Sequence, residues 1–372
     1  MRFSLKRFVF PLYLICVVTI GVELFTQFLI DKNDQYYIYP PYFKSMQKSN
    51  PEFTPGVYKD AHFRANELGI RSESYQGQDN VILILGGSTV IDVMLDQELT
   101  WAYQLQRLLI KESKWISTWV GNLGNSARAS ENHVDYMEKI FPYMPKPDFI
   151  LVLLGANDMQ LALKSSYGEG ELNDHNLLNY NVHPDNDFIS NFGIYRFYRQ
   201  MHQWYLRDKY AFIGNGAGFK MWRDCRQSAP EHTHVDKLPD LSEMQQVMWH
   251  SLESMEYLSR QYKAKIIFIT QPTLYNTSVG NAEKSVLMAG GVGPNNVWCK
   301  DKKYYSIGAL AKAMIEFNNI TRRFCKTKGL DCIDLAKKLP PKLENYFDEM
   351  HYSELGALKV ATVIAQEMSK MK

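Results

Sequence analysis

Residues 80–92 read NVILILGGSTVID, and this stretch decides the fold class of the 372-residue chain. Its apolar run VILIL is continuous and of strand length, which is typical of a parallel strand covered by helices on both faces. The run ends at Gly86 and Gly87, and Ser88 follows at once. Open α/β sheets bind their ligands at the carboxyl ends of such strands. The stretch therefore predicts an α/β sheet with Ser88 at its functional edge.

The alternation of strand-like and helix-like patterns continues along the chain. Strands separated by helices indicate βαβ units, a parallel sheet and right-handed crossovers. We expect a three-layer α/β domain over residues 79–372, with a large insertion at about 165–240 that is too long for an ordinary loop. The expected strands lie at 80–87, 117–122, 147–155, 265–270 and 332–336, and the expected helices at 98–113, 131–141, 241–262, 306–327 and from about 353.

The N-terminus has the pattern of a membrane anchor over residues 1–31. Basic residues precede an apolar stretch, residues 8–30, which is long enough to cross a bilayer of about 30 Å. The basic residues ahead of the stretch, together with Asp31 and Asp34 after it, favour an orientation with the N-terminus inside, so that the remaining chain is periplasmic or extracellular. A cleaved signal peptide is the rival interpretation, but no small-x-small site follows the stretch. A buried helix of a soluble protein is the third. Residues 32–78 are expected to be a juxtamembrane lead-in with little periodicity.

Charge and cysteine content limit the partners and cofactors. The net charge is +2 and no basic stripe with interleaved aromatic residues occurs, so we expect no nucleic acid partner. No spacing of Cys and His is typical of zinc, and we expect no metal and no cofactor. Cys16 lies in the apolar stretch, and the other four cysteines allow three pairings. Cys325 and Cys332 could close a small loop and leave Cys225 with Cys299, although four free thiols remain the alternative.

Three familiar motifs fail at the glycines before Ser88. A phosphate-binding loop needs a lysine after its second glycine, and none follows here. The dinucleotide fingerprint needs two further glycines, where Val90 and Ile91 stand. The nucleophile elbow of α/β-hydrolases needs a glycine at the position of Val90. What remains is a serine at the end of the first parallel strand, a position suited to a nucleophile.

A serine nucleophile needs a base, a group that orients the base, and donors for the oxyanion. In DEMH (348–351), Asp348 and His351 are three residues apart, so the carboxylate can hold the imidazole towards Ser88. Gly124 in NLG follows the second expected strand, and Asn157 in GAND follows the third. Each pattern is weak alone, but the four in this order form a specific set.

This ordered set resembles the SGNH hydrolases, also called the GDSL esterase/lipase family. LGGST matches the serine block, NLG the glycine block, GAND the asparagine block and DEMH the histidine block, over about residues 79–160 and 241–372. Gly87 stands where the family has its namesake aspartate, as in versions similar to membrane-anchored or secreted bacterial members. The resemblance implies a flavodoxin-like fold with a five-stranded parallel sheet.

The resemblance also implies the role of each residue in the set. Ser88 is expected to be the nucleophile, His351 the general base and acid, and Asp348 its orienting group. The expected oxyanion donors are the backbone N–H groups of Ser88 and Gly124 and the side-chain amide of Asn157. The expected reaction removes an acyl group, with acetyl favoured, from an extracytoplasmic carbohydrate or glycoconjugate. An O-acyltransferase using the same triad and a non-catalytic carbohydrate-binding or assembly protein remain alternatives.

Some residues outside the set are of types that can bind ligands, but a structural role explains them better. His232 and His234 lack a third ligand and are expected to lie in a solvated loop. Trp222 and other aromatic residues of the insertion could stack on sugars, although packing of an amphipathic helix is the simpler interpretation. The glycine-containing loop 288–296 could close over a substrate or simply connect two elements.

Overall fold

A five-stranded parallel sheet forms the centre of the molecule in the computed structural model. Its strand order, β4-β3-β5-β7-β8, is the 2-1-3-4-5 order of flavodoxin-like folds when these strands are counted along the chain. The expected fold class is therefore confirmed. The strands are β3 (Asn80–Gly86), β4 (Thr118–Asn122), β5 (Phe149–Leu154), β7 (Lys265–Thr270) and β8 (Cys332–Ile333). The structure describes residues 6–29, 37–165, 192–206, 210, 212–276, 280–292, 299 and 302–371.

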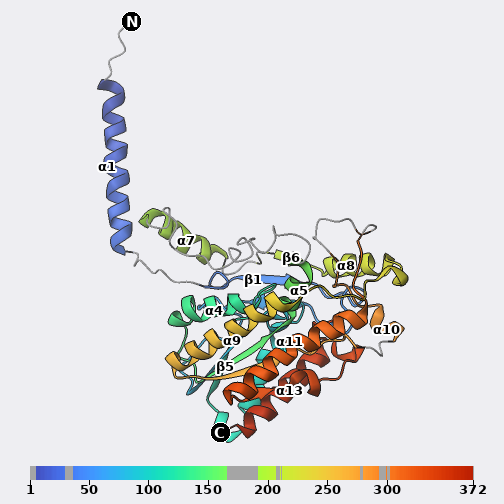
Figure 1. The fold of residues 1–372 in the computed structure, drawn as a ribbon. Helices are drawn as coiled ribbons and strands as arrows, with labels where there is room; N and C mark the ends of the chain where they lie inside the picture. Colours follow the sequence, from blue (N-terminus) through green and yellow to red (C-terminus); the bar gives the residue numbers. More distant parts are fainter. Residues whose placement is uncertain are drawn as a thin grey trace.

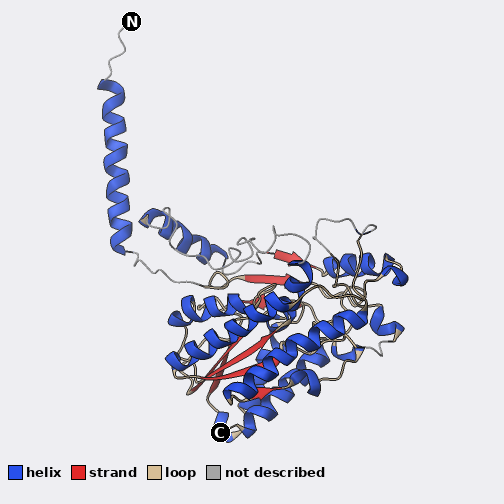
Figure 2. Ribbon diagram, viewed as in Figure 1, coloured by secondary structure: helices blue, strands red, loops and turns tan. Residues whose placement is uncertain are grey.

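Helices cover both faces of this sheet and complete the three layers (Figures 1 and 2). One group consists of α3 and α13, which pack on each other, and the other consists of α4, α5, α9 and α11. The inner strands are buried because helices cover them from both sides, as their unbroken apolar sequences predict. The bounds are α3 (Trp101–Leu109), α4 (Ser130–Lys139), α5 (Ala156–Ser165), α9 (Ser242–Tyr262), α11 (Ile307–Lys328) and α13 (Glu354–Lys370), with the short helices α2 (Ser88–Ile91), α10 (Asn281–Lys284) and α12 (Leu335–Lys338).

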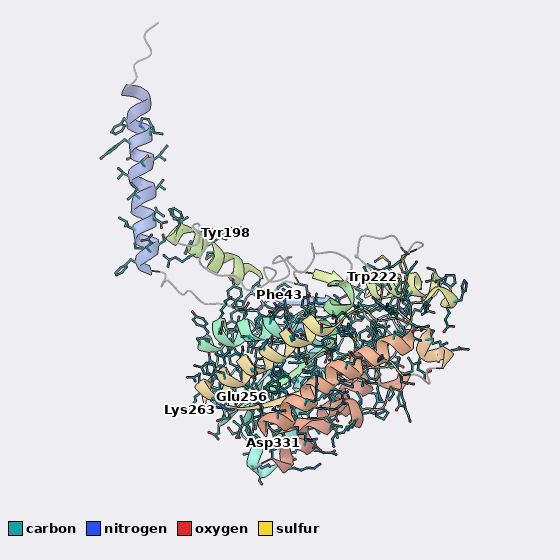
Figure 3. All side chains as sticks on the ribbon, viewed as in Figure 1. Phe43, Tyr198, Trp222, Glu256, Lys263 and Asp331 are labelled. Carbon is teal, nitrogen blue, oxygen red and sulfur yellow. A yellow bond between two sulfur atoms is a disulfide. The ribbon has the colours of Figure 1, made fainter. Side chains whose placement is uncertain are left out.

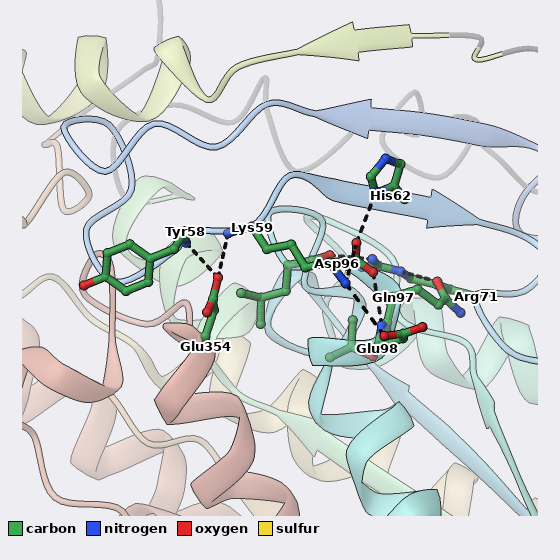
Figure 4. A network of polar contacts seen from close by, with 10 residues as sticks. Tyr58, Lys59, His62, Arg71, Asp96, Gln97, Glu98 and Glu354 are labelled. Atoms are coloured by element: carbon green, nitrogen blue, oxygen red, sulfur yellow. Dashed lines mark hydrogen bonds and ion pairs between the residues drawn. The ribbon is translucent and has the colours of Figure 1, made fainter.

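The described part of the expected lead-in, residues 37–78, packs against the domain and corrects the interpretation of it as a connection. It contains β1 (Lys44–Gln47) and β2 (Ala61–Arg64), which pair antiparallel. Ile38 and Ile70 are completely buried. In Figure 4, the Glu354 carboxylate of α13 accepts the N–H groups of residues 58 and 59, at 2.7 and 2.9 Å. The apolar residues of this segment show neither a helical nor a strand-like period, so the sequence did not indicate that they are buried.

The insertion has structure of its own in its described part. It contains α7 (Gly193–Leu206), β6 (Phe212–Gly214) and α8 (Ala217–Ser228), whereas residues 166–191 lie outside the described residues. β6 pairs parallel with β1, so the insertion and the N-terminal segment share a second, three-stranded sheet. Disulfides join Cys225 to Cys299 and Cys325 to Cys332, the pairing that the spacing allowed.

The N-terminal helix α1 (Lys6–Leu29) extends away from the α/β domain (Figure 1). Its segment Phe10–Phe28 has a mean hydropathy of 1.6 and is long and apolar enough to cross a membrane. The end of α1 contacts α7. The Glu23 carboxylate accepts the backbone N–H groups of Gly193 and Ile194, at 2.7 and 3.1 Å, and so caps the first turn of α7.

Candidate active site

The turn after β3 places Ser88 at the first residue of α2. Both preceding glycines are required by close contacts. A Cβ on Gly86 would lie 2.5 Å from the carbonyl oxygen of Leu153, and one on Gly87 would lie 2.2 Å from Nδ2 of Asn157. Neither glycine has a positive φ. Glycine is therefore needed at both positions because a side chain would not fit there, and not because the backbone is left-handed. The absence of a side chain at position 87 lets the Asn157 amide approach Ser88.

The structure brings Ser88, His351 and Asp348 together in one hydrogen-bonded chain. His351 Nε2 lies 2.8 Å from Ser88 Oγ, and His351 Nδ1 lies 2.6 Å from Asp348 Oδ2. An ionised carboxylate can only accept, so Nδ1 carries the proton, and a neutral ring leaves Nε2 to accept the Ser88 hydroxyl proton. This arrangement is the one that base-assisted attack by a serine requires.

Asp348 and His351 lie in a tight loop rather than in a helical turn. A bridge between Tyr346 and Tyr352 closes the loop, and the Phe347 N–H donates to the His351 carbonyl at 3.1 Å. Asp348 Oδ1 accepts the backbone N–H groups of Met350 and His351, both at 2.8 Å. The second carboxylate oxygen is thereby aimed at the imidazole, and the side chain of Asp348 is only 3% exposed.

The surroundings of His351 favour its protonated form. Burial alone lowers the pKa of the imidazole. The charge and the hydrogen bond of Asp348 raise this pKa, the charges of Glu349 and Asp92 raise it further, and together they outweigh the effect of burial. The net result is a pKa above the ordinary value for histidine. The Phe347 ring stacks on the imidazole with centroids 5.5 Å apart, and this contact fixes the plane of the ring.

Two of the three expected oxyanion donors are available, and the third is engaged elsewhere. The Ser88 N–H begins α2 and makes no hydrogen bond within the described part of the chain. Asn157 Nδ2 donates one hydrogen to the Arg128 carbonyl at 2.8 Å, which leaves its other hydrogen for the cavity. The Gly124 N–H, however, donates to Asn122 Oδ1 at 2.8 Å. In this structure the Gly124 N–H is therefore engaged with the side chain at the end of β4, and its expected role as an oxyanion donor stays a prediction.

Ala127, three residues after Gly124, is a further residue of the cavity wall. It lines the cavity beside Ser88 and Asn157. Its φ of +59° lies in the left-handed region, which is uncommon for a residue with a side chain. Its N–H makes no hydrogen bond to any residue that the structure describes. An alanine gives no sequence signal for this conformation.

Arg71 is a further residue of the site that sequence reasoning missed. Its guanidinium is buried and donates to the carbonyl oxygens of Ile91 and Asp92 at 2.5 and 2.8 Å, and to that of Leu95 at 2.6 Å. It thus holds the last residue of the helix that carries Ser88 and the chain just after it. Burial lowers the pKa of Arg71 to about 10, so it stays protonated at neutral pH. Because Arg71 belongs to no motif and its segment has no periodic pattern, the sequence did not indicate this role.

Ser88 and His351 open into a cavity of about 780 Å³. Its wall includes Gly290 and Gly291 from the expected glycine loop 288–296, of which residues 293–296 lie outside the described residues. Trp222 on α8 also lines it, so the alternative in which this ring meets a ligand gains support (Figure 3). The Glu349 carboxylate lines the cavity as well and accepts the N–H groups of residues 288 and 289. Burial, and then the charge of Asp348, raises the pKa of Glu349 to about 7.

Neither His133 nor His232 lines this cavity. His232 belongs to an exposed turn, and among the described residues no group of three or more His, Cys, Asp or Glu could hold a metal ion. His133 is completely buried, and burial lowers its pKa to about 3, so it is a neutral core residue.

Comparisons with known proteins give remote structural matches. No protein-family model matches the chain, and no curated protein does. LAE5, an alpha/beta hydrolase enzyme from the metagenome of Lake Arreo, Spain, is 11% identical, with 80% of this chain and 99% of that one covered and a TM-score of 0.41. The acetylxylan esterase Axe2 from Geobacillus stearothermophilus is 12% identical, with 78% and 95% covered and a TM-score of 0.41. At these values the likeness carries no information on activity, which has to follow from the site.

Proposed function

We propose that this protein is a serine esterase of the SGNH hydrolase type that acts through Ser88, His351 and Asp348. The observation that carries the proposal is the hydrogen-bonded chain of these three side chains at a cavity, with the Ser88 N–H and the Asn157 amide beside the nucleophile. Nucleophile, base, orienting carboxylate and oxyanion donors are the complete set for acyl transfer to serine.

The geometry supports a two-stage reaction. As Ser88 Oγ attacks the ester carbonyl, its proton moves to His351 Nε2 and the carbonyl π pair moves to oxygen. Collapse of the tetrahedral intermediate breaks the bond to the alcohol, which takes the proton from His351 and leaves an acyl group on Ser88. Water then loses a proton to His351 and attacks the acyl carbon. The carboxylic acid departs as Ser88 Oγ regains a proton.

The developing oxyanion is expected to bind three donors: the N–H groups of Ser88 and Ala127 and the free amide hydrogen of Asn157. Ala127 replaces Gly124 in this role because its N–H is the unengaged one.

Replacing Asn157 with alanine is expected to lower kcat by about 10²- to 10³-fold with little change in KM, because an oxyanion donor acts mainly on the transition state. Initial rates with 4-nitrophenyl acetate measure the effect. Asn281, exposed at the start of α10, provides the matched control, and Asn281→Ala should keep the wild-type rate. Equal rates for both variants would remove Asn157 from the oxyanion site.

The acyl group is proposed to be acetyl and the alcohol an extracytoplasmic carbohydrate or glycoconjugate. A cavity of about 780 Å³ is much larger than an acetyl group needs, so most of it is available to the alcohol. If a sugar hydroxyl replaces water in the second stage, the same residues catalyse acyl transfer. The products formed from an acetyl ester with and without an added saccharide distinguish hydrolysis from transfer.

The chain is also proposed to be anchored in a membrane by α1, with its N-terminus inside. The apolar residues Ile194, Phe197, Tyr198 and Met201 of α7 are exposed, and their spacing places them on one helix face. Figure 3 shows Tyr198 on α7, which contacts the end of α1. Such a face is typical of a helix that lies in the membrane interface. The Glu23 cap then holds α7 at the end of the spanning segment.

This topology predicts the reactivity of single cysteines introduced into a Cys16→Ser chain in a bacterial membrane. Ile116, which is 73% exposed on the α/β domain, is the outside position, and Ser4 before the apolar stretch is the inside one. A membrane-impermeant maleimide added to spheroplasts should label Ile116→Cys and should label Ser4→Cys only after permeabilisation. The reverse pattern would contradict the proposed orientation.

A further inference from the structure

A buried lysine lines the cavity that contains the proposed nucleophile. Lys302 is 9% exposed, and its Nζ lies 5.3 Å from the centre of the Trp222 ring. Within the described residues, Nζ makes no hydrogen bond and no ion pair. The Trp222 ring replaces only part of the hydration that burial removes, so a buried ammonium with no hydrogen-bond acceptor or counter-charge among the described residues is unfavourable. The site is therefore suited to an anion supplied by the ligand.

A second cation lines the same cavity. Lys164, near the end of α5, adds to burial in lowering the pKa of Lys302, so the two positive charges influence one another. Glu349 is the carboxylate of the cavity wall, but its oxygens accept backbone N–H groups of residues 288 and 289 rather than the ammonium of Lys302.

The wall around Lys302 is held in place without a ligand. Arg226 on α8 donates to the carbonyl oxygens of Ala289 and Tyr305 at 2.6 and 3.0 Å, and so joins α8 to the segments on either side of Lys302. The disulfide between Cys225 and Cys299 adds a covalent link between the same regions. A Cβ on Gly291 would lie 2.2 Å from Lys302 Cε, so a glycine is needed there for the lysine stem.

We propose that Lys302, together with Lys164, binds an anionic substituent on the alcohol side of the substrate, a carboxylate or a phosphate, while Trp222 covers the adjoining sugar ring. The substrate is then an acyl ester of an acidic saccharide. The proposal rests on the proposed function for the identity of the ester, but the anion site can be tested without any reaction. Aromatic rings commonly cover the apolar face of a ligand, while a few charged groups provide specificity.

Calorimetric titration of the full-length wild-type chain in detergent tests this proposal, with digalacturonate, glucose 6-phosphate and neutral galactobiose as ligands. We expect at least one anionic saccharide to bind about tenfold or more tightly than galactobiose, which corresponds to one charge-assisted contact. The better of the two anions identifies the carboxylate or the phosphate as the favoured group. None of these ligands is a carboxylic ester, so a failure here is distinguishable from a lack of esterase activity.

Variants of Lys302 test whether this residue causes the preference for the anionic saccharide. Lys302→Gln should remove most of the preference for the anion and Lys302→Arg should keep part of it, whereas Lys312→Gln, a control on the exposed face of α11, should keep all of it. Thermal unfolding shows whether each variant is folded. The proposal is overturned if no anion binds more tightly than galactobiose, or if folded Lys302→Gln and Lys302→Arg both keep the full preference.

Discussion

Replacement of Ser88 by alanine is expected to lower kcat for an acetyl ester by about 10⁶-fold, the size of the loss when the serine nucleophile is removed from an enzyme with a triad. The Oγ of Ser88 is the atom that forms the acyl intermediate, and it lies 2.8 Å from the nitrogen that takes its proton. Among the described residues, no other side-chain hydroxyl contacts His351 Nε2 and could take over this role. Initial rates with 4-nitrophenyl acetate measure the loss.

The control for this variant is a serine with a purely structural hydrogen bond. Ser285 Oγ donates to the carbonyl oxygen of Ala282 on the surface, and Ser285→Ala should keep the wild-type rate. Thermal unfolding of Ser88→Ala should match that of the wild type, because the hydroxyl faces the cavity rather than the core. A Ser88→Ala protein with the wild-type rate would exclude the proposed nucleophile.

Replacement of Asp348 by asparagine is expected to lower kcat by about 10⁴-fold, the effect of the corresponding change in a serine protease triad. Asparagine keeps the size of the side chain, but an amide NH₂ facing Nδ1 would favour the ring form with its proton on Nε2. That form cannot accept the Ser88 proton. The backbone hydrogen bonds to Oδ1 can persist, so the loop should keep its conformation.

The pH dependence of kcat/KM separates this explanation from simple damage to the loop. The base must be neutral to accept a proton, and the pKa of His351 is raised by Asp348. In the wild type, activity should therefore fall on the acid side around a pKa above about 6.5, the ordinary value for histidine. In Asp348→Asn the residual activity should show this acid limb at lower pH, because loss of the negative charge of Asp348 lowers the pKa of His351. An unmoved limb would mean that Asp348 does not act through His351.

Residues that directly follow a strand were predictable from the sequence, and residues placed by long-range packing were not. Ser88 and Asn157 follow buried strands, and the carboxyl ends of parallel strands meet at one edge, so their proximity followed from the pattern. The roles of Asp348 and His351 could be inferred from their spacing of three residues. The engagement of the Gly124 N–H could not be predicted in this way, because a backbone N–H is available only if no side chain takes it, and Asn122 does.

The sequence did not indicate that residues 37–78 pack on the domain, or that Trp222 and Lys302 lie together in the cavity wall. Arg71 reaches the chain after α2 only because residues 37–78 fold onto the domain, which their aperiodic sequence does not indicate. Trp222 and Lys302 meet because a disulfide and Arg226 join the insertion to a loop about 70 residues later. Contacts of this kind depend on the complete fold.

Site-resolved labelling with a fluorophosphonate tests the central claim most directly, because this reagent bonds to activated serine oxygens without requiring the natural substrate. Peptide mass spectrometry of the labelled wild-type chain should place the single adduct on Ser88. Labelling should be lost in Ser88→Ala and strongly slowed in Asp348→Asn. An adduct on another serine, or no adduct on a folded wild-type chain, would contradict the account of a serine esterase built on Ser88.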